Sequence, residues 1–291
     1  MNLLPALILR RGQLNSAAVW LVFVASLLAA VGLADAQTLP ASLQSEFEAG
    51  VAALEAGHLD EAERDFLHVL REQGKASFVY NNLGIVYQMR GDQARAATQF
   101  REAIRLQPDY AAPHILLGAS LLAIGGNLEA VRELERAVKI DPHQPQARAE
   151  LAEAYKRMGN YQGLIEQYQA LHSMQPADPE YLYQLGHAYF DQAQRCLTEI
   201  KKIDPNAPCL YQTLGENYRL QGHLDLAITL YERALSIEPK RPGIHLALAE
   251  IYLRQGQAAK ARKEIDEELA IVPESATAQA LARTIAAEEQ K

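Results

Sequence analysis

Prolines recur every 34 residues along this chain, and this period restricts the possible folds more than any other feature of the sequence. The series is Pro108, Pro142, Pro176, Pro205, Pro239 and Pro273, with one short step of 29 residues before Pro205. A second series of small residues keeps the same period and the same short step: Gly50, Gly84, Gly118, Ala152, Gly186, Gly215 and Ala249. Shared periods of this length indicate that one supersecondary unit repeats along the chain.

Each repeated position has a physical role in a pair of helices. A small residue such as Gly84 lets the first helix approach its partner, and Tyr87 lies on the same face because residues three apart are neighbours on a helix. Gly91 ends that helix in a left-handed conformation. A second amphipathic helix follows with Phe100 facing inward, and Pro108 ends it because proline lacks the helical donor. No stretch alternates with period two, so we expect no strands.

This unit resembles the tetratricopeptide repeat, a helix-turn-helix unit of 34 residues. The best copy is 77–110, and its residues that match the family are Tyr80, Leu83, Gly84, Tyr87, Ala96, Phe100, Ala103 and Pro108. Further copies run 111–144, 145–178, 208–241 and 242–275, with a weaker first copy at 43–76. The resemblance implies an all-α fold, a right-handed α-solenoid of stacked helix-turn-helix repeats.

The fifth unit departs from this pattern, because it lacks five residues and the glycine between its helices. Its apolar residues keep helical spacing without a break, which predicts one long helix at 180–203; a tight turn near 191–193 is the alternative. A single helix at 277–289 should cap the last repeat. The expected domains are 1–36, repeats one to four at 43–178, the shortened unit at 179–205, two further repeats at 206–275 and the cap at 276–291.

Residues 1–36 have the pattern of a secretory signal peptide. Arg10 and Arg11 precede an uncharged apolar stretch at 17–33, and residues 34–36 have the small-x-small form of a cleavage site. We therefore expect a periplasmic or secreted protein that begins at Gln37, with no membrane span in the mature chain. The alternative is an uncleaved N-terminal membrane anchor, since the apolar stretch is close to the length of a span.

The sequence carries no pattern that predicts catalysis. Its formal net charge of −8 disfavours nucleic-acid binding, which depends on clustered Lys and Arg. No two of the eight histidines form a metal-binding pair four residues apart with a third ligand, so we interpret His114 and His245 as packing residues. Cys196 and Cys209 could pair after export, but the expected helix end and turn between them favour two free packing residues. We expect no enzyme activity, cofactor or metal.

The resemblance implies a concave groove lined by the first helix of each repeat. Its expected apolar half comprises Phe47, Val51, Leu54, Phe78, Asn81, Ile85, Gln88, Met89, Ile115 and Leu122, and its charged half Lys156, Arg157, His187 and Arg219. The apolar half would take a hydrophobic segment and the charged half would fix its orientation. The alternatives are that the apolar half packs on residues 37–42 and that the charged half is only solvated.

The expected function is a non-catalytic scaffold or adaptor that binds a protein or peptide in an exported compartment. The alternative is a structural or assembly subunit of an envelope complex, held at the membrane by a retained N-terminal helix.

Overall fold

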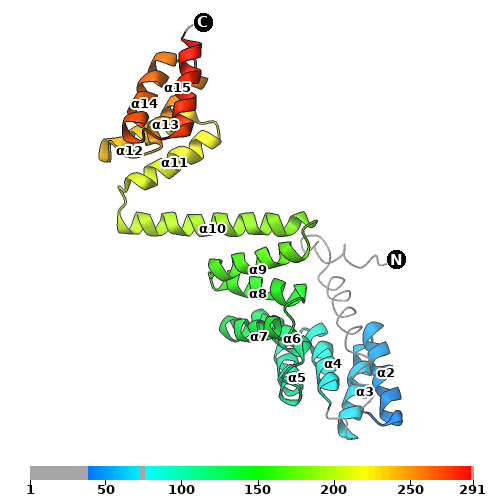
Figure 1. The fold of residues 1–291 in the computed structure, drawn as a ribbon. Coiled ribbons are helices and arrows are strands. Elements are labelled where there is room, and N and C mark those ends of the chain that lie inside the picture. The colour runs from blue at the N-terminus through cyan, green and yellow to red at the C-terminus, as the bar shows by residue number, and fades with distance from the viewer. Residues whose placement is uncertain (1–38, 73–75, 290–291) are drawn as a thin grey trace. The chain divides into compact units, whose positions relative to one another are not determined.

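The computed structural model describes residues 39–72 and 76–289, and within these ranges it contains helices and no strand (Figure 1). The predicted signal peptide or anchor at 1–36 lies outside the described residues. Within them, no helix has both the length and the apolar character needed to cross a bilayer. The predicted all-α solenoid is confirmed.

The helices follow one another as pairs, one pair to each repeat. The first four pairs are α2 (Ala41–Glu55) with α3 (Leu59–Arg71), α4 (Ser77–Met89) with α5 (Gln93–Leu106), α6 (Ala111–Ala123) with α7 (Asn127–Ile140), and α8 (Pro145–Arg157) with α9 (Tyr161–Met174). The single helix α10 (Pro179–Ile203) comes next. The last helices are α11 (Pro208–Leu220) with α12 (Leu224–Ile237), α13 (Ile244–Arg254) with α14 (Ala258–Ile271), and α15 (Ala276–Glu288).

The chain forms two compact units, which divide between Asp191 and Gln192, inside α10. The core of the first unit runs through α2 to α8, and a smaller cluster joins α8, α9 and the first half of α10. In the second unit, one cluster fills the space between α12 and α13. A further cluster places Ala278 and Ile285 of α15 against α13 and α14, which confirms the predicted capping helix.

The turn between the two helices of a repeat closes on a glycine with a positive φ. Gly91 has a φ of 80°, and its N–H donates to the carbonyl of Gln88 at 3.0 Å. The next N–H, of Asp92, donates to the carbonyl of Tyr87 at 2.9 Å, which completes the motif that satisfies the last carbonyls of a helix. The carboxylate of Asp92 then accepts from the backbone N–H of Arg95 and caps the second helix.

The glycine inside the first helix is the point where the two helices of a repeat meet. A Cβ added at Gly84 would lie 2.5 Å from the ring of Phe100, which stands sixteen residues later. The same spacing joins Gly50 to Phe66, Gly118 to Leu134 and Gly215 to Tyr231, where the added Cβ would lie between 2.5 and 2.9 Å from the partner side chain. The sequence-based explanation of this position is confirmed.

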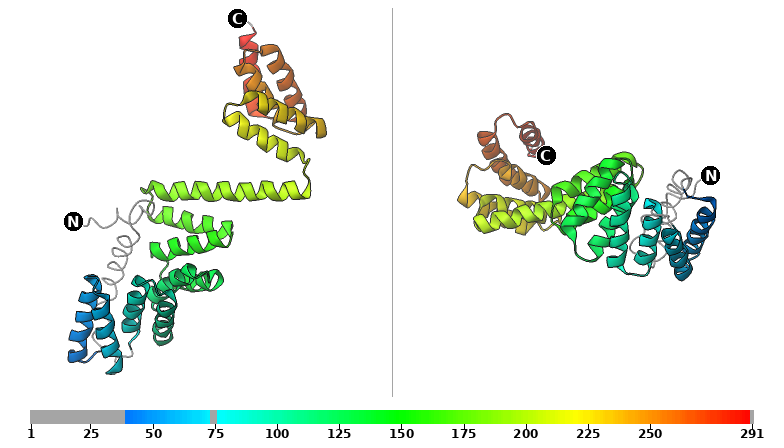
Figure 2. Two further views of the ribbon diagram at one scale, coloured as in Figure 1. Left: turned by 180° about the vertical axis from the view of Figure 1, so that it is seen from behind. Right: turned by 90° about the horizontal axis from the view of Figure 1, so that it is seen from below.

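Helix α10 replaces the helix pair of the fifth unit, as the sequence predicts. It runs unbroken from Pro179 to Ile203 and is continuous in the left view of Figure 2. Tyr181 and Ala188 are buried, and Ala188 packs with residues of α8 and α9. A Cβ added at Gly186, however, would meet no atom of the described chain outside its own helix within 4 Å. One face of α10 therefore lacks the second helix that the other repeats supply.

The two cysteines, on α10 and α11, are both free thiols among the described residues. Both are unpaired, as favoured from the sequence, and Cys209 is partly buried. The interpretation of Cys196 as a packing residue is wrong, because its side chain is exposed on α10. The histidines interpreted as packing residues are also confirmed in that role. His114 contacts the carboxylate of Glu133 at 2.7 Å and the carbonyl of Pro108 at 3.0 Å. His245 makes equivalent contacts in the last repeat.

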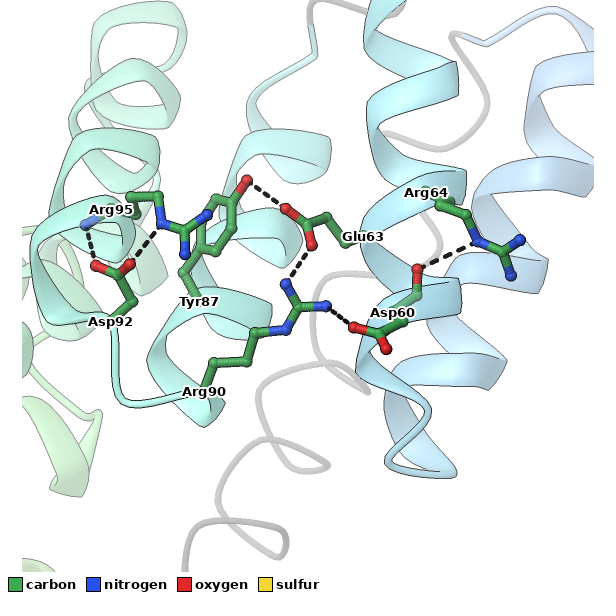
Figure 3. A network of polar contacts seen from close by, with 7 residues as sticks. All are labelled: Asp60, Glu63, Arg64, Tyr87, Arg90, Asp92 and Arg95. Carbon is green, nitrogen blue, oxygen red and sulfur yellow. Dashed lines mark hydrogen bonds and ion pairs between the residues drawn. The ribbon is translucent and has the colours of Figure 1, made fainter.

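A polar network joins the first repeat to the second (Figure 3). The hydroxyl of Tyr87 on α4 donates to Glu63 on α3 at 2.8 Å, and the guanidinium of Arg90 pairs with both Glu63 and Asp60. Burial raises the pKa of Glu63, but the hydrogen bonds from Tyr87 and Arg90 lower it by more, so this pKa lies below its ordinary value. The guanidinium of Arg95 lies over the ring of Tyr87, 4.6 Å from its centroid.

We predict that Gly84→Ala lowers the free energy of unfolding by about 1–3 kcal/mol, because the added methyl group overpacks the contact with Phe100. Urea unfolding of the chain from Gln37 onward, followed by circular dichroism, measures this change. Thr98→Ala, an exposed substitution on α5, is the control and should change the stability by less than about 0.5 kcal/mol. Equal effects of the two substitutions would contradict the proposed role of the glycine.

We also predict that Glu63→Ala destabilises the protein at pH 7 by about 1–3 kcal/mol, since it leaves Tyr87 and Arg90 without their acceptor. Because the pKa of Glu63 is lowered in the folded state, its contribution is complete above the unfolded value of about 4.3 and is lost as the pH falls through the folded value. The difference from the wild type should therefore shrink below about pH 4. Glu61→Ala, a mostly exposed change on the same helix, is the control.

Candidate functional site

Most of the apolar positions predicted to line the groove are buried in the structure. None of the following side chains is more than 7% exposed: Phe47, Leu54, Phe78, Asn81, Ile85, Gln88, Ile115 and Leu122. Val51 and Met89 are partly buried and pack against the same core. In this structure these ten residues therefore belong to the interior of the first unit more than to its surface. Their role in binding stays a prediction.

Contacts between successive first helices explain part of this burial. The ring of Phe47 on α2 lies edge-on to that of Phe78 on α4, with centroids 4.9 Å apart. The amide of Gln88 on α4 donates to the hydroxyl of Ser120 on α6 at 3.1 Å. Leu39 also packs against this cluster, and it belongs to the segment 37–42 that the sequence offered as an alternative cover.

The same face of α4 holds two unsatisfied acceptors. The side-chain oxygens of Asn81 and Gln88 are buried and have no hydrogen-bond partner among the described residues. Buried polar atoms in folded proteins are nearly always hydrogen-bonded, because an unsatisfied one is costly. In this structure both oxygens have almost no exposed surface.

Three of the charged-half positions lie on the first unit and are exposed. Lys156 and Arg157 form the end of α8, and His187 lies on α10. The guanidinium of Arg157 donates to Glu153 at 2.8 Å and to the carbonyl of Leu122 at 2.6 Å, which joins α8 to α6. Lys156 lies beside it on an exposed helix end. The structure thus places two basic groups at the end of one first helix.

Aromatic side chains on α10 accompany these basic groups. Tyr183 and Phe190 are 59% and 57% exposed, and the ring of His187 lies edge-on to that of Tyr183, with centroids 4.4 Å apart. Helices α8 and α10 are the first helices of consecutive units and share a core through Ala152 and Ala188. Sequence reasoning did not select Phe190, although it holds the same position in its helix as Gln88 does in α4. That register was the signal that could have identified it.

Arg219 belongs to the second unit and has a structural role there. Its guanidinium donates to Glu216 at 2.5 Å and to Glu250 at 3.0 Å, which links α11 to α13. The hydrogen bond from Arg219 is the main reason that the pKa of Glu216 is lowered, and the same bond raises the pKa of Arg219. Tyr231 also donates to Glu216, at 2.7 Å. Two carboxylates therefore balance the charge of Arg219.

Comparison with known families identifies the class of protein that this architecture defines. Three family models, each described as a tetratricopeptide repeat, match residues 77–110, 115–179 and 218–285. Together these matches span more than half of the chain. The chain belongs to the tetratricopeptide repeat family.

Solved structures with a similar fold include several tetratricopeptide repeat proteins. One, from Parabacteroides merdae, is 14% identical with a TM-score of 0.47. The match covers 85% of this chain and 100% of that protein. YrrB, described as having an unusual peptide-binding site, is 15% identical with a TM-score of 0.40; the match covers 75% of this chain and 97% of YrrB.

The match to the Cut9–Hcn1 complex of the APC/C has 18% identity and a TM-score of 0.45, and it covers 91% of this chain. The chain spans 45% of the length of that relative. No curated protein sequence matches the chain.

Proposed function

We propose that this protein is a non-catalytic scaffold that binds a protein or peptide through the first helices of its repeats. The observation that carries this proposal is the exposure of Tyr183 and Phe190 on α10 within a repeat array whose first helices line one surface. Aromatic residues and arginine dominate the binding energy of protein interfaces. Arg157 and Lys156 lie on the preceding first helix, α8. This combination supports a contact site on α8 and α10.

The chemistry of this surface suggests the kind of segment that it binds. Tyr183 and Phe190 offer apolar area for an apolar or aromatic anchor. Lys156 and Arg157 favour carboxylates next to that anchor. An acidic peptide segment with an apolar anchor combines these features.

We also propose that the protein acts after export. Arg10, Arg11 and the apolar stretch at 17–33 support a secretory signal that ends at residue 36. N-terminal sequencing of the exported protein tests this proposal, with Gln37 as the expected first residue. A protein that begins at Met1 would instead support the membrane-tethered assembly subunit.

The binding surface is tested by capture of partners on the chain from Gln37 onward. Tyr183→Ala and Lys156→Glu should each weaken the affinity for the captured partner at least about tenfold, measured by calorimetry. These positions suit the test because both side chains are exposed, whereas a charge at the buried Ile85 would unfold the repeat.

Two exposed substitutions in the second unit are the matched controls. Leu220→Ala removes exposed apolar area, and Lys240→Glu reverses an exposed charge. Neither should change the affinity by more than about twofold. Undiminished binding by both Tyr183→Ala and Lys156→Glu would contradict the proposed surface.

A further inference from the structure

Helix α10 carries the packing residues of both helices of a repeat on one continuous helix. Its first half holds the positions that face the second helix in other repeats, and its second half holds the positions that face the first. When positions are counted back from Pro205 in this unit and from Pro108 in the second repeat, the second half of α10 aligns with α5. The first-half positions are Leu185, Gly186 and Tyr189, and the second-half positions are Ala193, Leu197 and Ile200, equivalent to Ala96, Phe100 and Ala103.

In the complete repeats these two sets of residues bury each other. Gly84 contacts Phe100 so closely that a Cβ would lie 2.5 Å from the ring. Ala96, Phe100 and Ala103 are completely buried. The corresponding residues of α12, which are Ala227, Tyr231 and Ala234, are at most 1% exposed.

In α10 the two sets do not bury each other, although Leu185 packs against the cluster shared with α8 and α9 and the hydroxyl of Tyr189 accepts from Gln169 on α9 at 2.9 Å. A Cβ at Gly186 would meet no atom of the described chain outside its own helix within 4 Å, and the side chain of Tyr189 is 47% exposed. In the second half, Ala193 is exposed, while Leu197 and Ile200 are only partly buried. The helix thus has an open packing position for a second helix at Gly186. Eleven residues later it carries Leu197, a side chain of the type that occupies this position in the complete repeats.

These two features cannot meet within one chain. At about 1.5 Å per residue, eleven residues of a continuous helix hold Gly186 and Leu197 roughly 16 Å apart. In a second copy that runs antiparallel, however, Leu197 would lie against Gly186 of the first, and the reverse contact would form at the same time. Such an arrangement is two-fold symmetric and closed, as most homodimers are.

We propose that two copies of this protein associate through an antiparallel pair of α10 helices, in which Leu197 of each copy packs on Gly186 of the other. The pairing rebuilds the missing helix contact of the fifth unit between chains. It covers exposed apolar side chains on the same face, such as Leu182 and Tyr189. The symmetry centre falls between Asp191 and Gln192, midway between Gly186 and Leu197.

The charges of the helix support the antiparallel direction. The first half of α10 contains Glu180 and Asp191 and no Lys or Arg. The second half contains Arg195, Lys201 and Lys202 with a single acidic residue, Glu199. In an antiparallel pair, the acidic half of each helix therefore lies along the basic half of the other. A parallel pair would place like charges together.

The mass of the purified chain in solution tests this proposal without any other protein present. The chain from Gln37 onward contains every described helix, and its mass is measured by sedimentation velocity from about 1 to about 100 µM. We expect a dimer that dissociates on dilution. Gly186→Leu should raise the dissociation constant at least tenfold, because the new side chain occupies the space that Leu197 of the other copy needs. Its helix content should match that of the wild type, since the site is open in the single chain.

Thr198→Leu is the matched control, because it adds a similar apolar side chain at an exposed position on another face of α10. Its dissociation constant should stay within about twofold of that of the wild type. A wild-type chain that is monomeric at about 100 µM overturns the proposal, as does a Gly186→Leu chain that dimerises as well as the wild type.

Cysteine pairing tests the register. Copies with Gly186→Cys and copies with Leu197→Cys, both with Cys196→Ser and Cys209→Ser, are mixed and oxidised. A disulfide-linked dimer should form mainly between the two different copies. Equal amounts of linked dimer in each variant alone would contradict the antiparallel register. Partner binding plays no part in these readouts, so their failure would leave the proposed scaffold function intact.

Discussion

The close approach of two helices at one small residue is the contact on which the rest of this structure depends. Where Gly84 meets Phe100, the ring occupies the space that a Cβ would need. The same contact recurs sixteen residues apart in other repeats, for example at Gly118 and Leu134. Because this contact fixes the distance between the two helices, it makes each pair a unit that can stack on the next one. The small residue of this contact recurs with the 34-residue period because each repeat needs the same close approach of its two helices.

Stacking leaves each repeat dependent on its neighbours, and polar contacts reinforce the apolar ones. Tyr87 reaches back to Glu63 on the previous repeat, and Tyr155 reaches Glu135 in the same way, at 2.7 Å. In the second unit, Arg219 connects α11 to Glu250 of α13. Such contacts act only between adjacent units, as expected for a solenoid whose stability is a sum of repeat and nearest-neighbour terms.

The sequence predicted the helices well because their signals are local. Glycine with a positive φ and proline mark the helix ends by their own backbone chemistry, and the unbroken apolar spacing predicted α10. The surface was harder to predict, because helical spacing gives the face on which a side chain lies but not what covers that face. Ile85 and Glu153 hold the same position in their repeats, yet Ile85 is buried and Glu153 is partly exposed.

The loss of five residues in the fifth unit has two consequences that act on the same face of one helix. It leaves Gly186 without its second helix, and it leaves the aromatic rings of Tyr183 and Phe190 exposed on α10. Tyr183 stands three residues before Gly186 and Phe190 four residues after it, so both rings lie within about 60° of Gly186 around the helix axis. A helix that packs at Gly186 therefore covers part of the surface that we propose for partner binding. Self-association and partner binding would then be coupled, because both use Tyr183 and Phe190.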